Sequence, residues 1–93
     1  MIVEAKDVRF FEITEIPTSE GPAVKIRGLV FHSSLAVDHL DARRSGEDVV
    51  LEVFLTPARQ GLSGSFSTNV PLSSGVKRIL FGPSAAQIWP AKQ

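Results

Sequence analysis

Two histidines, each beside hydroxyl or carboxyl side chains, are the residues of this chain best suited to acid–base chemistry. The candidates are His32 followed by Ser33 and Ser34, and His39 flanked by Asp38 and Asp41. A hydrolase needs a nucleophile, a base that takes its proton and a third group that orients the base. No serine lies in a GxSxG frame, and neighbouring residues of a strand point to opposite faces. The serines are better explained as partners of backbone groups in a turn. We therefore expect no catalytic residue and no enzyme.

A cluster of acids near the middle of the chain has the residue types of a cation site. Its members are Asp38, His39, Asp41, Glu47 and Asp48. A calcium site at a hairpin tip would need these oxygens to converge, but Arg43 and Arg44 lie between them and would neutralise their charge. The EF-hand pattern is absent, and a chain without cysteine has no thiolate ligand, disulfide or CxxC pair. We expect a solvated charged hairpin, with no metal and no cofactor.

A third group of residues could bind a ligand without doing chemistry. Lys25, Arg27, Leu29 and Phe31 alternate on the outward face of one strand, and Phe54 could lie on the same sheet face in a neighbouring strand. Aromatic and basic side chains on one sheet face are typical of nucleic-acid binding. However, ten Lys plus Arg against ten Asp plus Glu leave no net charge for a polyanion. We expect no nucleic-acid partner.

The same residues have a plainer explanation, because both faces of the central sheet carry large apolar side chains. Leu29, Phe31, Val50 and Phe54 all lie opposite the best core positions. An apolar patch of this kind is either covered or forms an interface. One cover is the chain itself, through the leucines and valine of residues 35–40. The other is a partner protein or a second subunit. We favour coverage by the chain itself, with a partner protein or a second subunit as the alternative.

Three further aromatic residues need an interpretation. Trp89 just before Pro90 is expected to be a core or sheet-edge residue, with an anchor for a peptide or glycan as the alternative. Phe10 and Phe11 are consecutive in a strand whose alternation slips, so one should fill the core and the other point toward a partner. The candidate interaction surface is Lys25, Arg27, Leu29, Phe31, Phe54 and Trp89.

The elements that must position these residues are strands, because Pro and Gly interrupt segments rich in Val, Ile, Phe and Thr. Strands are expected within residues 3–13, 23–32, 49–55, 65–72, 76–81 and 85–89. Residues 35–42 favour a weak strand over a helical turn, with a turn near Gly46. The strand over residues 49–55 is almost entirely apolar and should be central. Pro71 places the strand that contains it at a sheet edge, or ends it.

These elements predict an all-β fold in which residues 1–93 form one antiparallel β-sandwich of six to seven strands. Its architecture resembles that of immunoglobulin-like and fibronectin type III-like domains. The chain departs from them because it has no cysteine pair, no tyrosine, and its single tryptophan lies near the C-terminus. A small β-barrel is the alternative.

A soluble, cysteine-free single domain of this kind suggests a protein-interaction or structural accessory role without catalysis. Docking would use the apolar outer sheet face, or an edge strand within residues 1–6 or 85–89. The alternative is a small carbohydrate-binding module in which Trp89, Phe31 or Phe54 stack on sugars. Its polar partners would be Asp38, Asp41 or Gln87. A hydrolase comes third.

No apolar run approaches the roughly 20 residues that span a bilayer, so we expect no membrane insertion. The first residues lack a signal-peptide pattern. This leaves a cytoplasmic protein, or a periplasmic or secreted one whose leader was removed.

Overall fold

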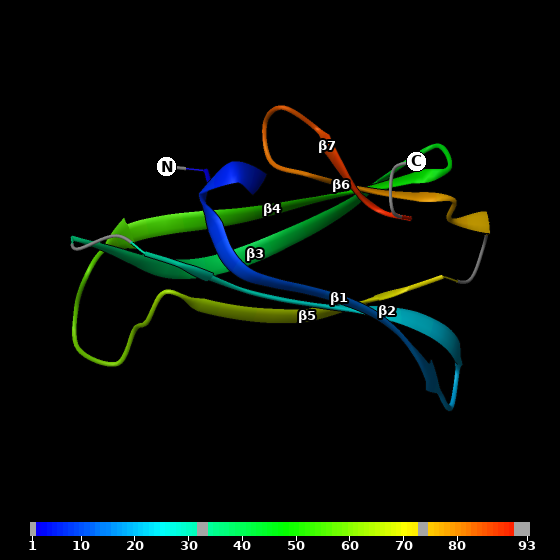
Figure 1. The fold of residues 1–93 in the computed structure, drawn as a ribbon, viewed down its shortest axis with the longest axis horizontal. Helices are drawn as coiled ribbons and strands as arrows, with labels where there is room; N and C mark the ends of the chain where they lie inside the picture. The colour runs from blue at the N-terminus through cyan, green and yellow to red at the C-terminus, as the bar shows by residue number, and fades with distance from the viewer. Residues whose placement is uncertain (1, 32–33, 73–74, 91–93) are drawn as a thin grey trace.

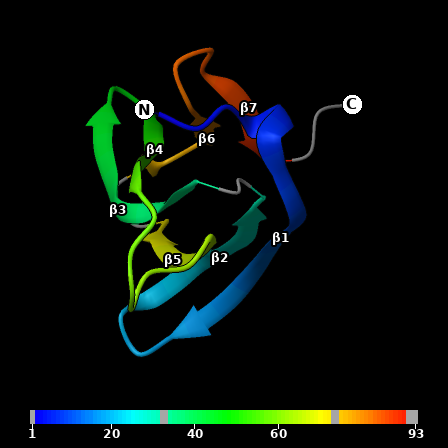
Figure 2. The same cartoon turned by 90° about the vertical axis from the view of Figure 1, so that its left-hand side faces the viewer.

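The computed structural model describes residues 2–31, 34–72 and 75–90. Within them the chain forms a short 3₁₀ helix and seven strands in two sheets (Figures 1 and 2). The elements are η1 (Ala5–Asp7), β1 (Val8–Thr18), β2 (Gly21–Val30), β3 (Leu35–Ser45), β4 (Asp48–Pro57), β5 (Ser65–Pro71), β6 (Arg78–Phe81) and β7 (Ala86–Trp89). One sheet has the order β1-β2-β5 and the other β3-β4-β6-β7. The all-β prediction is confirmed, and two separate sheets take the place of the alternative closed barrel.

A single hydrophobic core lies between the two sheets, because alternate residues of the central strands point inward. Val24 and Ile26 of β2 are fully buried, as their alternation with lysine and arginine predicts. In the other sheet Leu51 and Val53 of β4 are equally buried. The remaining members of the core cluster are Val3, Val8, Val30, Val49, Leu55, Phe66, Val70, Ile79 and Phe81. The expectation that residues 49–55 form a central strand is confirmed, since β4 lies between β3 and β6.

The predicted slip in the first strand is a bulge in β1. The pairing of β1 with β2 shifts between Arg9 and Glu12. Phe10 takes a positive φ of 54° within this bulge, so the side chains of Phe10 and Phe11 do not follow simple alternation. Phe11 packs against the core, with its ring centroid 5.3 Å from that of Phe81.

The segment whose type was ambiguous is a strand. β3 continues to Ser45 and turns at Gly46, where a φ of 60° suits a residue without Cβ. Its irregularity between Val37 and His39 explains the weak sequence pattern. β5 is an edge strand of its sheet and ends at Pro71, as predicted.

The prediction of a purely antiparallel sandwich is wrong at one pair of strands, because β6 runs parallel to β4. The chain leaves β4, forms β5 in the other sheet and then returns to pair with β4. A parallel pair requires a crossover connection of this kind, and a hairpin cannot provide it.

The expected edge strands fare differently. β7 is indeed an edge strand of the four-stranded sheet. In the described residues 2–6 the N-terminal segment pairs with β4 through an isolated bridge and forms no strand: Ile2 bridges Phe54, and the Val3 N–H donates to the carbonyl of Val53 at 3.0 Å. It therefore completes the side of β4 that the short β6 leaves open, while Met1 lies outside the described residues.

The apolar segment around β3 does not cover an outer sheet face. Leu35, Val37 and Leu40 pack against the core cluster instead, because this segment joins the four-stranded sheet as a strand. The prediction that these side chains cover the outer sheet face is therefore wrong.

Among the described residues there is no helix long and apolar enough to cross a membrane.

The N-terminal segment is tied to the turn between β6 and β7 by Glu4. Its carboxylate accepts the hydroxyl of Ser84 at 2.5 Å and the backbone N–H of Ser84 at 3.1 Å. These hydrogen bonds, the hydroxyl bond foremost, hold the pKa of Glu4 below its ordinary 4.5. They link residues that are 80 positions apart in the chain.

We predict that this tether makes stability fall in acid. A carboxylate whose pKa is lower in the folded state stabilises the fold above the unfolded pKa, and the contribution disappears as the pH falls through the folded pKa. Glu4→Gln should reduce the melting temperature at neutral pH and flatten its decline below pH 4.5. Glu20→Gln, in the exposed β1–β2 turn, is the control. Parallel melting curves for wild type and Glu4→Gln across the acid range would contradict the prediction.

Gly28 lies opposite Phe66 on the neighbouring strand, where there is no room for a side chain. A Cβ at this position would lie 2.5 Å from Cγ1 of Val8 and 2.7 Å from Cζ of Phe66. We predict that Gly28→Ala lowers the free energy of unfolding by about 1 to 3 kcal/mol in urea denaturation, as overpacking does. Adding Val8→Ala removes the nearest atom, so the double variant should lose less than the sum of the single losses. Additive losses would show that the clash is not the cause.

Candidate interaction surface

Phe10 and Phe31 are the large hydrophobic residues that the described part of the chain leaves exposed. Their side chains are 75% and 66% exposed. The rings contact each other edge to face, with centroids 6.3 Å apart and planes at 69°. Phe10 is presented by the bulge of β1, and Phe31 follows the last residue of β2. We call these two residues the Phe10–Phe31 pair.

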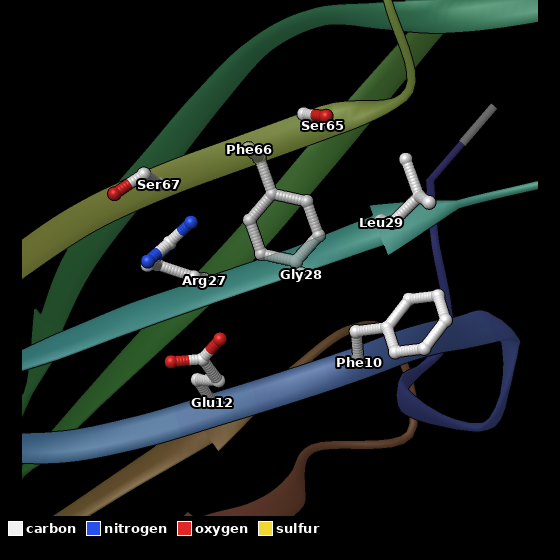
Figure 3. Close-up of a pocket in the computed structure, with 8 residues that line it drawn as sticks. All are labelled: Phe10, Glu12, Arg27, Gly28, Leu29, Ser65, Phe66 and Ser67. Atoms are coloured by element: carbon white, nitrogen blue, oxygen red, sulfur yellow. The ribbon is translucent and has the colours of Figure 1, made fainter.

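Beside this pair lies a hollow of about 340 Å³ on the outer face of the three-stranded sheet (Figure 3). Its lining comes from all three strands: Phe10, Glu12, Arg27, Gly28, Leu29, Ser65, Phe66 and Ser67. Leu29 pairs with Ser65 and Arg27 with Ser67, and paired residues of neighbouring strands share a sheet face. At this end of the face β5 contributes only the small hydroxyl side chains of Ser65 and Ser67, which leave the space beside Leu29 and Arg27 open.

The outer face of the three-stranded sheet carries more positively than negatively charged side chains. Its strand positions hold the cations Arg9, Lys25 and Arg27 and one acid, Glu12. Glu12 is the direct partner of Arg27 in the β1–β2 pairing, yet the two form no ion pair. Elsewhere in the described structure directly opposed charges do pair, as Arg78 and Asp48 do at 2.7 Å. Within the described ranges, no carboxylate forms an ion pair with the three cations of this face.

The structure brings together four of the six residues expected to form an interaction surface. Lys25, Arg27 and Leu29 lie on the outer face of β2, and Phe31 follows at its end. Phe54 does not share this face, because β4 belongs to the other sheet. Its ring stacks on His39 instead, with centroids 4.5 Å apart. The expected placement of Phe54 beside β2 is wrong, since sequence alternation does not say which strands share a sheet.

Trp89 is also separate from this surface. It lies in β7 of the four-stranded sheet, half-buried and packed against the core, which agrees with the structural role expected for it. The sequence missed Arg9 and Glu12 and the serines of β5 as members of the surface, because strand order decides their position. The consecutive phenylalanines were the available signal for Phe10, and the split between an inward Phe11 and an outward Phe10 is confirmed.

The residues considered for catalysis and metal binding occupy other places. His32 and Ser33 lie outside the described residues. His39 is exposed, with Nδ1 2.8 Å from a carboxylate oxygen of Asp38. Glu47 pairs with Lys77 at 3.1 Å and Asp48 with Arg78 at 2.7 Å. Across the described ranges no three His, Cys, Asp or Glu side chains converge on one point.

No protein-family model matches this chain, and neither the curated proteins nor the solved structures contain a significant match.

The backbone at Phe10 is strained, because a positive φ of 54° brings the Cβ of an ordinary residue close to its own backbone. This conformation costs roughly 1 to 2 kcal/mol in a residue other than glycine. The side chain of Phe10 makes no core contact that would offset this cost, because the residue is largely exposed.

We predict opposite effects on stability for the two neighbouring phenylalanines. Phe10→Gly should leave the free energy of unfolding unchanged or raise it by up to about 1 kcal/mol, because it relieves the strain and removes no core contact. Phe11→Ala should lower it by about 2 to 3 kcal/mol, because its ring packs in the core. Urea denaturation measures both. Equal losses for the two variants would mean that Phe10 is a structural residue.

Proposed function

We propose that this chain is a non-enzymatic protein-interaction or structural accessory domain that docks through the outer face of its three-stranded sheet. The observation that carries the proposal is the exposed Phe10–Phe31 pair. Aromatic residues and arginine are enriched where protein interfaces concentrate their binding energy. Both residue types lie here around one hollow.

The strain at Phe10 supports this role. Strained residues persist where the surrounding structure enforces them, and they gather at functional sites. Here the bulge that sends Phe11 into the core also places Phe10 on the surface. A partner that covered Phe10 would bury its exposed apolar surface, and this burial would favour binding. The free protein keeps that surface exposed even though the backbone at Phe10 is strained.

Docking by strand addition at β7 has less support. β7 is an edge strand, but it has only four residues, and its side chains are all half-buried. A short edge offers few backbone hydrogen bonds to an added strand.

The carbohydrate-binding alternative also has less support. The rings of the Phe10–Phe31 pair stand at 69° and present no common plane for a sugar. Trp89 packs against the core and Phe54 stacks on His39. Asp38 is engaged by His39, and the amide of Gln87 donates to the carbonyl of Pro90 at 3.0 Å.

We further propose that the fold is an immunoglobulin-like or fibronectin type III-like sandwich. The order β1-β2-β5 matches the first, second and fifth strands of an immunoglobulin sheet, which are neighbours there. The position of β4 beside β6, and their parallel pairing, depart from that arrangement. The proposal therefore concerns a variant in which the fourth strand has a different place.

Selection of peptides from a random display library tests the docking proposal. Immobilised wild-type protein should enrich a set of peptides, whereas a Phe10→Ser and Phe31→Ser double variant should lose them, because it lacks the exposed aromatic area. Circular dichroism checks that the variant is folded. Thr14→Ser, on the same face, removes one methyl group and no aromatic ring, and is the control. Peptides that bind wild type and the double variant equally would exclude this face as the docking site.

A further inference from the structure

We propose that the partner of this face is an acidic protein segment that carries an apolar or aromatic anchor residue. This inference rests on the proposed function, because it names the chemistry of the partner that docks there. Two properties of the face carry it: an excess of cations that take part in none of the ion pairs among the described residues, and a hollow beside them that Phe10 and Leu29 line on one side.

The cations set the charge of the partner. Lys25 and Arg27 are two residues apart on β2, and Arg9 lies on β1 as the direct partner of Leu29. None of the three takes part in the ion pairs of the described residues. The guanidinium of Arg9 has one hydrogen bond, to the carbonyl of Lys6 at 3.5 Å. Glu12 is the single acid among them, so carboxylates of a partner would meet a net positive surface.

The hollow is the site where the anchor residue of the partner would bind. A side chain that entered it would contact Phe10 and Leu29 and lie over the backbone of Gly28 (Figure 3). The hydroxyls of Ser65 and Ser67 line its other side. An apolar anchor at the centre with charged contacts at the rim is the usual arrangement of a protein interface.

The geometry favours a protein segment over single-stranded nucleic acid. Nucleic-acid binding of that kind uses aromatic faces on which bases stack, along a continuous cationic track. Phe10 and Phe31 contact edge to face, so the ring face at their contact is already covered. Glu12 lies next to Arg27 and interrupts the positive surface.

Three matched fluorescent peptides test the inference, each with one central tryptophan, flanked by glutamates, by glutamines or by lysines. We expect the glutamate peptide to bind wild type most tightly and to weaken as salt rises. Lys25→Glu with Arg27→Glu should weaken it at least about threefold and strengthen the lysine peptide. Lys77→Glu, a single charge reversal ahead of β6, should leave both unchanged. Phe31→Ser should weaken every peptide at least about tenfold.

Each other outcome overturns the inference in a distinguishable way. Equal binding of the glutamate and glutamine peptides, still lost in Phe31→Ser, would reject an acidic partner and leave the docking face standing. Peptide binding that is unchanged in Phe31→Ser, or no peptide binding at all, would reject both the docking face and the acidic partner. Tighter binding of an oligothymidylate than of the glutamate peptide, lost in the charge-reversed variant, would identify a nucleic-acid face instead.

Discussion

Phe11, Phe66 and Phe81 form a ring cluster on which the packing of the two sheets depends. Phe11 and Phe66 belong to the three-stranded sheet, and Phe81 belongs to the other. The rings of Phe66 and Phe81 stack with centroids 6.0 Å apart, and Phe11 contacts both edge to face. Aromatic side chains bury large apolar areas, and edge-to-face contacts add to that gain. In a chain without disulfides, these contacts are a main link between the layers.

The position of Phe11 in this cluster has a consequence on the opposite face. A regular strand would send Phe10 and Arg9 to alternate sides, but the β1 bulge places both near the outer face while Phe11 turns inward. The core contact of Phe11 can therefore offset the backbone strain at Phe10. Stability and the exposed aromatic surface are linked through two consecutive residues, which is why their substitution should have opposite effects.

Hydrogen bonds to the N-terminal segment complete the four-stranded sheet. β6 pairs with only the first part of β4, and the Val3 N–H takes up the carbonyl of Val53 farther along. Glu4 then holds this segment to the β6–β7 turn through Ser84. Segments from the two ends of the chain thus meet around the crossover that makes β4 and β6 parallel.

The local pattern of residue types in the sequence was enough to predict the strands and which of their residues face the core. Alternation of apolar and charged residues placed Val24 and Ile26 in the core, Gly46 and Pro71 marked a turn and an edge, and the doubled phenylalanine marked the bulge. These features depend on interactions between near neighbours, so the sequence reveals them directly. It also grouped Lys25, Arg27, Leu29 and Phe31, because they are alternate residues of one segment.

Only the tertiary structure decided which strands are neighbours. In the structure Phe54 and Trp89 lie away from the outer face of β2, whereas Phe10, Arg9 and the β5 serines lie on it. The structure also shows that β6 is parallel to β4. Strand order is fixed by contacts between segments far apart in the chain, and the same alternating pattern fits several orders. The physical reason is that side-chain alternation has a period of two along each strand and carries no information about the strand beside it.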